Sequence, residues 1–294
     1  MPHTLQNEFL KLNIDEPLEG YNFSRFDWTG KITEVHYKGV PVSTIENTLS
    51  ENHNTIGQGF YNEFSTTTPI GFKETRFGDW FLKIGIGLLK KEKHSYHFLE
   101  NYIVKPAQFT FDIKNDKAII ICTSELTNGY AYVLKKEIVL NDNSFSIHYH
   151  LENAGQKDII TNEYNHNFLA INNDLIGTNY TLKFPFEINP RRFRKTVNLE
   201  NKVDINTNSI GFNDTPNEDF FFSNLSGKSN IENKWELLHS KNKFGITSKG
   251  DFNVNKVNLW GWKHVICPEM FFKIYLNAGE SRQWTRTYNF FDLK

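Results

Sequence analysis

Two polar residues lie inside strand-like segments that are otherwise strongly aromatic. His166 lies in ITNEYNHNFLAI between two asparagines, and Glu269 lies in PEMFFKIYL. Because alternate side chains of a strand face the same side, His166 shares a face with Tyr164 and Phe168. An imidazole and a carboxylate could work together as a general acid and a general base. Each also has a structural interpretation, since such a histidine is often only hydrogen-bonded and a glutamate at a strand end is often only solvated.

A third segment, WFLKIGIGLL, places Lys83 on the face opposite Leu82, Ile84, Ile86 and Leu88. The three segments thus offer faces that combine aromatic rings, glycines and one or two polar groups. This combination is typical of a carbohydrate cleft, where rings stack on the sugar, polar groups bind its hydroxyls and glycines leave room. Lys83 could equally be an ordinary lysine whose aliphatic chain packs on the strand while its ammonium group stays in water.

Other polar groups suggest chemistry less strongly. His148 and His150 are spaced to share one strand face and could chelate a metal, but no third ligand is evident. The run PRRFRK, with Arg191–Arg194, could bind a phosphate or carboxylate, or could be only a solvated loop. The sequence has no glycine-rich phosphate loop, no G-x-S-x-G elbow and no CxxC motif. We therefore expect no metal site.

The composition excludes several classes of protein. The chain has 294 residues, a formal net charge of -1 and no basic excess that would indicate nucleic acid. No apolar run is long enough to span a bilayer, and the N-terminal sequence has no apolar segment typical of a secretory signal. Cys122 and Cys267 are far apart and fit two reduced thiols. We expect a cytoplasmic protein that binds neither nucleic acid nor membranes.

The elements that must position these residues are almost all strands. Residues 144–151 alternate with a period of two, so that Phe145, Ile147 and Tyr149 share a face, and only LQNEFLKL shows a weak helical period. We expect an all-β protein, a large single-domain antiparallel β-sandwich over residues 1–294 with residues 1–19 as an N-terminal extension. Residues 190–230 are less regular and are expected to form long loops of the kind that bind ligands. Further predicted strands are KAIIICTSEL, YAYVLKKEIVL, NYTLKFPF, KFGITS and MFFKIYL.

Four segments together resemble the aldose 1-epimerase (galactose mutarotase-like) family: SRFDWTGKITEVHYKG, GDWFLKIGIGLL, TNEYNHNFLAI and VICPEMFFKIYLNAGESRQWTRTYNF. The resemblance runs from about Tyr21 to Phe291. It implies a galactose mutarotase-like supersandwich and the interconversion of sugar anomers without a metal or organic cofactor. The family's general acid falls on His166 and its general base on Glu269.

The sequence also departs from the family pattern. A second histidine of the family has no counterpart in ETRFGDWFLKIGIG, and an arginine of the preceding loop has none in GQGFYNEF. These departures therefore put the family's usual substrate, a neutral hexose, in doubt more than its acid–base chemistry. The residues that the resemblance and the strand faces suggest for substrate binding are Asn62, Glu63, Arg76, Asp79, Lys83, Tyr164, Asn165, Phe168 and Asp219.

Three hypotheses follow, all with a small-molecule carbohydrate as the partner. The first is an aldose 1-epimerase-like enzyme that acts on a free sugar or a sugar derivative. The second is a carbohydrate-binding protein without catalysis, which has no need of an acid–base pair. The third is an enzyme for a uronate or a sugar phosphate, in which Lys83 and Arg191–Arg194 bind the anion. The sequence makes no prediction about oligomeric state.

Overall fold

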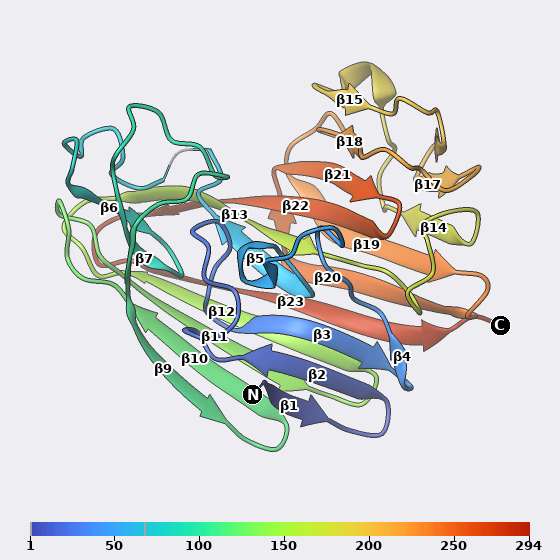
Figure 1. Cartoon of the computed structure of the whole chain (residues 1–294), viewed down its shortest axis with the longest axis horizontal. Coiled ribbons are helices and arrows are strands. Elements are labelled where there is room, and N and C mark those ends of the chain that lie inside the picture. Colours follow the sequence, from blue (N-terminus) through green and yellow to red (C-terminus); the bar gives the residue numbers. More distant parts are fainter. Residues whose placement is uncertain (1, 68) are drawn as a thin grey trace.

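Two large antiparallel sheets pack face to face in the computed structural model, which describes residues 2–67 and 69–294 (Figure 1). We call the first the pocket sheet. Its order is β1 (His3–Gln6), β2 (Leu10–Asp15), β3 (Lys31–Tyr37), β5 (Phe60–Phe64), β13 (Ile159–Asn167), β22 (Val265–Leu276), β21 (Lys256–Trp262), β18 (Phe220–Phe222) and β15 (Thr196–Val197), with β4 (Val40–Pro41) paired to β3.

We call the second the back sheet. Its order is β16 (Val203–Ile205), β17 (Ser209–Phe212), β14 (Tyr180–Lys183), β19 (Ile231–His239), β20 (Phe244–Val254), β23 (Ser281–Asp292), β12 (Ser144–Asn153), β11 (Tyr132–Leu140), β10 (Lys117–Thr123) and β9 (Gln108–Ile113). A small third sheet and two 3-10 turns complete the elements: β6 (Trp80–Lys83), β7 (Gly87–Lys90), β8 (Val104–Pro106), η1 (His53–Thr55) and η2 (Pro190–Arg192).

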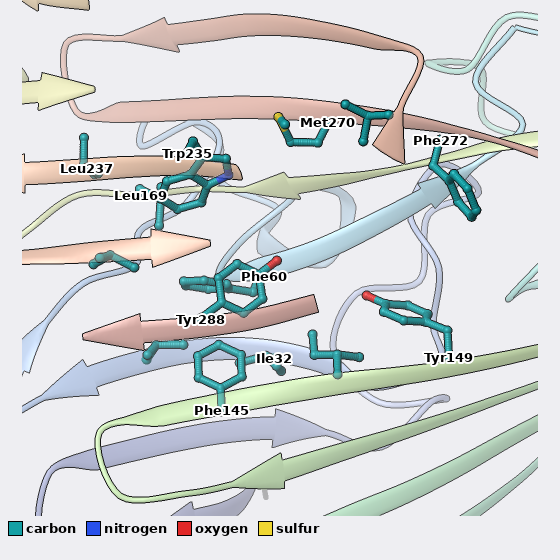
Figure 2. Packing of buried hydrophobic residues seen from close by; sticks show 14 of the residues in the cluster. Ile32, Phe60, Phe145, Tyr149, Leu169, Trp235, Leu237, Met270, Phe272 and Tyr288 are labelled. Carbon is teal, nitrogen blue, oxygen red and sulfur yellow. The ribbon is translucent and has the colours of Figure 1, made fainter. Parts of the chain in front are cut away.

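The core between the two sheets is filled by the inward side chains of alternating strands (Figure 2). Phe60 of the pocket sheet meets Tyr288 of the back sheet edge-on at 4.9 Å, and Tyr288 stacks on Phe145 at 4.8 Å. Large aromatic rings bridge the spacing of about 10 Å between packed sheets with few side chains. This accounts for a β-sandwich core in a chain whose hydrophobic fraction is only 38%.

The predicted all-β fold class and the face assignments of the longest strands are confirmed. On β12, Phe145, Ile147, Tyr149 and Leu151 are all buried in the core. On β22, the core face is formed by Met270, Phe272, Ile274 and Leu276.

The weak helical expectation for LQNEFLKL is wrong. This segment forms part of β1, a tight connection and part of β2. β1 pairs with β2 and β2 pairs with β3, so the two strands form one edge of the pocket sheet. Leu5, Leu10 and Leu12 are buried there. Burial against the sheet outweighs the local helical period, so the segment expected to be an N-terminal extension supplies two strands of the sandwich.

Two further segments differ from their predicted form. WFLKIGIGLL is a hairpin rather than one strand. Gly85 in the turn and Gly87 at the start of β7 adopt positive φ angles of 79° and 135°. Ile86 therefore leaves the face of Leu82 and packs in a separate aromatic cluster. Residues 190–230, expected to be long loops, carry η2 and the short strands β15 to β18.

Within the described ranges, no helix is long and apolar enough to cross a membrane.

Candidate active site

His166 and Glu269 lie opposite each other on two neighbouring central strands of the pocket sheet. Asn165 of β13 pairs with Met270 of β22, and the next pair along this antiparallel register brings His166 beside Glu269 on the face turned away from the back sheet. The Nε2 atom of His166 is 3.4 Å from Oε1 of Glu269. Both residues are largely buried, with exposed fractions of 2% and 7%.

Neighbouring side chains fix both members of the pair. Asn258 of β21 donates its Nδ2 hydrogen to Oε2 of Glu269 at 3.0 Å, which leaves Oε1 for the histidine. The His166 ring stacks on Phe168 at 4.4 Å and lies 5.7 Å from Trp260. Its Nδ1 atom is buried and has no hydrogen-bond partner among the described residues. Aromatic packing rather than a second hydrogen bond therefore orients the imidazole.

The electrostatics of the pair favour neutral groups. Burial raises the pKa of Glu269 to about 7, although Asn258, Arg25 and Lys256 oppose this shift. Burial lowers the pKa of His166 well below its usual value, and the positive charge of Arg25 adds to the effect. Desolvation penalises the charged form of either group. Near neutral pH the Glu269 carboxyl therefore exchanges readily between its protonated and charged forms, while the His166 imidazole stays neutral.

A cluster of charged residues lies beside the pair, centred on Arg25 from the segment SRFDW. Its Nη1 atom is 2.6 Å from Glu46 and its Nε atom is 3.2 Å from Glu63. The hydroxyl of Tyr164 donates to Glu63 at 2.6 Å. The Nζ atom of Lys83 lies 3.6 Å from the other oxygen of Glu63. Sequence reasoning misses Arg25 as a site residue, because the segment SRFDW carries only a family resemblance.

A pocket of about 880 Å³ opens beside Glu269 and runs along the outer face of β22. Its floor is formed by Glu269, Phe271, Lys273 and Tyr275, which are the four residues predicted to share this face. Its walls come from several other elements and include Arg25, Tyr164, Arg194, Asn224, Asn255, Lys256, Asn258 and Arg282.

Some of the predicted substrate-binding residues come to this site. Tyr164 lines the pocket, and its ring stacks on Phe271 at 4.4 Å. Phe168 lies behind His166 and is fully buried. Glu63 and Lys83 are also fully buried behind Tyr164. The Nζ atom of Lys83 donates to the backbone oxygen of Phe64 and to the Tyr96 hydroxyl, so the proposal that Lys83 grips an anion in the pocket is corrected.

Other predicted residues lie elsewhere. Asn62 and Asn165 point between the two sheets, because each is one residue away from an outward-facing position on its strand. Arg76 and Asp79 are exposed in the loop before β6, and Asp219 is exposed before β18. None of these five side chains lines the pocket.

Of the arginine run and the histidine pair, only the arginine run contributes a residue to the pocket. Arg194 lines the pocket, whereas Arg191 and Arg192 are exposed in η2 and do not. His148 and His150 lie beside a shallow hollow on the outer face of the back sheet. Across residues 2–67 and 69–294, no three His, Cys, Asp or Glu side chains are grouped so that they could hold a metal ion.

The fold defines the class: this is a galactose mutarotase-like β-sandwich. A candidate aldose 1-epimerase from Escherichia coli K12 is similar over 100% of this chain and 99% of its own, with a TM-score of 0.64 and 10% identity. A galactose mutarotase related enzyme from Lactobacillus acidophilus covers 100% of both chains, with a TM-score of 0.59 and 13% identity. An aldose epimerase homologue from C. elegans also covers 100% of both, with a TM-score of 0.55 and 8% identity.

These likenesses concern the fold, since the identities are low. No protein-family model matches the sequence, and no curated protein matches it either.

Proposed function

We propose that this protein is an aldose 1-epimerase-like enzyme that interconverts the α and β anomers of a sugar by general acid–base catalysis. One observation carries the proposal: the carboxyl of Glu269 and the imidazole of His166 lie 3.4 Å apart, both desolvated, with Glu269 on the floor of a pocket large enough for a sugar. A protein that only binds sugars needs no such pair. The fold likeness to aldose epimerases and mutarotases supports the same class of reaction.

Ring opening requires two proton transfers at atoms bonded to the same carbon. A base removes the proton of the anomeric hydroxyl, an acid delivers a proton to the ring oxygen, and the bond between the anomeric carbon and the ring oxygen breaks to give the aldehyde. The sugar stays neutral throughout because one proton leaves as another arrives. Rotation about the C1–C2 bond followed by closure then gives the other anomer. Each positioned acid or base contributes about 10²–10⁴-fold to such a reaction.

The pKa shifts suggest which group starts in which form. Since burial raises the pKa of Glu269 and lowers that of His166, the favoured resting form is a protonated carboxyl beside a neutral imidazole. In that form Glu269 donates to the ring oxygen and His166 accepts from the anomeric hydroxyl. Closure then uses the reverse transfers, with His166 as acid and Glu269 as base. This proposal reverses the assignment implied by the family resemblance, in which Glu269 takes the proton of the anomeric hydroxyl and His166 protonates the ring oxygen during opening.

The pocket also offers a surface for the sugar ring. Phe271 lies on the floor directly after Glu269 on the same face, and Tyr164 stacks on it. Aromatic faces bind the apolar C–H surface of a sugar, while side-chain amides such as Asn255 and Asn224 on the walls can bind its hydroxyls.

The test is anomer exchange measured by NMR on freshly dissolved aldoses, with the wild type, Glu269→Gln and His166→Gln. Both substitutions keep the approximate size of the side chain and remove its titration. We expect wild-type acceleration of at least one sugar and a loss of about 10²-fold or more in each variant, with unchanged folding. If no aldose, neutral or anionic, exchanges faster than in buffer alone, the epimerase proposal fails and a binding protein becomes the better account.

A further inference from the structure

We infer that the pocket accepts an anionic sugar, whose carboxylate or phosphate binds at Lys256 and Arg194 while its anomeric carbon meets Glu269 and His166. This inference rests on the proposed function and specifies its substrate class. It follows from the charges that line the pocket and from their positions relative to Glu269.

The lining of the pocket is strongly biased toward positive charge. Glu269 is the only acidic residue among the described residues that line it, whereas five are basic. One of the five, Arg25, is neutralised by Glu46 and Glu63. Within the described part of the chain, the other four have no carboxylate at ion-pair distance: Arg194, Lys256, Lys273 and Arg282.

Four cations of the pocket lining have no carboxylate partner among the described residues, and a bound anion would supply one. Arg194, Lys273 and Arg282 are exposed, whereas Lys256 is half-buried and its Nζ atom lies 3.8 Å from the centroid of the Phe271 ring. Burial lowers the pKa of Lys256, the nearby Arg194 guanidinium lowers it further, and Glu269 opposes the shift. Two like charges held near each other on a pocket wall are stabilised when an anion binds between them.

The strand register places this anion site at a suitable distance from the reacting pair. Lys256 of β21 is directly opposite Phe271 of β22, so Glu269 is its diagonal neighbour, about 7–8 Å away between backbones. That span suits a substituent on the far side of one pyranose ring from the anomeric carbon. Lys273 is four residues along β22 from Glu269, about 13 Å away, which is too far for the same sugar.

The experiment compares three matched substrates: a neutral hexose, its uronate and its 6-phosphate. Anomer exchange of each is measured with the wild type, Lys256→Met and Arg194→Met. Methionine keeps an unbranched side chain at each position and removes the charge. Lys249→Met, an exposed change on the back sheet strand β20, is the control for net charge.

We expect kcat/KM for at least one anionic sugar to exceed that for the neutral hexose by about tenfold or more, a size typical of hydrogen bonds to charged groups. Lys256→Met and Arg194→Met should lower the anionic value by a similar factor, mainly through KM, and change the neutral value less than about threefold. The uronate and the 6-phosphate arms show which anion is preferred. Equal turnover of the neutral and anionic sugars, or equal losses for both in Lys256→Met, overturns the inference.

The two proposals can fail separately. If no sugar is interconverted, binding of the uronate and the 6-phosphate is measured by calorimetry on the wild type and Lys256→Met. Binding that the substitution weakens about tenfold keeps the anion site while the epimerase proposal falls. Absence of binding for both anions overturns the anion site as well.

Discussion

The pocket sheet carries buried polar groups on both of its faces, and the two groups are built differently. On the inner face, Arg286 of β23 makes two contacts of 2.6 Å with the carboxylate of Glu163, and Lys136 lies 2.5 Å from Asp27. We call these four residues and Asn62 the inner network. On the outer face, the contact between His166 and Glu269 is 3.4 Å long. The inner charges are closely paired with each other. The two members of the outer pair are farther apart, and Asn258 and Phe168 fix them.

The same strands supply both groups. On β13, Glu163 and Asn165 point inward while Tyr164 and His166 point outward. Alternation along a strand thus separates two kinds of polar residue that are neighbours in sequence. Burial disfavours the charge of Arg286, but its short contacts with Glu163 outweigh this and raise its pKa, so the charge is fixed. The desolvated and weakly paired Glu269 instead has a pKa near neutrality and can exchange protons. The comparison indicates that the inner network is structural and the outer pair is chemical.

The largest expected effect comes from breaking the inner network. Arg286→Met leaves the carboxylate of Glu163 buried without its cation, so the free energy of unfolding should fall by about 3–5 kcal/mol. Urea unfolding measures this, with Arg282→Met, an exposed change on the same strand, as the control. The double variant Glu163→Gln with Arg286→Met should lose less than the single variant. A loss below about 1 kcal/mol for Arg286→Met would mean that the network is not structural.

Removing the charge of Glu269 in the outer pair should raise the free energy of unfolding at alkaline pH rather than lower it. The pKa of Glu269 is raised from 4.5 to about 7, so its stabilising protonated form is complete below pH 4.5 and is lost as the pH rises through 7. Above that pH the buried charge costs about 3 kcal/mol. Glu269→Gln should therefore unfold at higher urea concentration than the wild type at pH 8, and at nearly the same concentration at pH 4.5.

A matched control sharpens this stability prediction. Glu232→Gln removes an exposed carboxylate on β19 and should leave the urea midpoint almost unchanged at both pH values. Destabilisation of Glu269→Gln at pH 8 would show that the carboxylate is a satisfied structural group, like Glu163.

The smallest expected effect tests how Glu269 is tuned. The hydrogen bond from Asn258 favours the charged carboxylate, so Asn258→Leu should raise the pKa of Glu269 further. The alkaline limb of the pH–rate profile should move upward by about 0.5–1 pH unit, since one hydrogen bond contributes roughly 1 kcal/mol. Asn253→Leu, an exposed change on β20, is the control. A downward shift of the limb contradicts the account.

Residue types and periodicity could predict much of this fold and part of the site. The face of β22 with Glu269, Phe271, Lys273 and Tyr275 follows from alternation alone, and it forms the pocket floor. Strand parity also separates His166 from its sequence neighbour, which is why the structure turns Asn165 away from the pocket. Periodicity works at these positions because one face of each strand packs into the apolar core between the sheets.

The rest of the site depends on contacts that are distant in sequence. Arg25 reaches the pocket from a loop, and neither periodicity nor a local motif shows which carboxylates it meets. Asn258 and Lys256 matter only because β21 pairs with β22 in one particular register. Lys83 lies on the predicted face of its strand, but its Nζ atom is engaged by Glu63 and the Tyr96 hydroxyl, and a pattern of alternating residues does not reveal such contacts.

The most direct test follows anomer exchange of the best substrate from pH 5.5 to 8.5, corrected for the rate in buffer, while NMR reports the protonation of the Glu269 carboxyl. The account predicts that the enzymatic rate and the protonated fraction of this carboxyl fall together, with a midpoint near pH 7. It also predicts that Glu269→Gln shows little rate at any pH in this range. A carboxyl that titrates near its ordinary value of 4.5, with a rate unchanged through pH 7, would contradict the central claim that burial makes this pair an acid and a base.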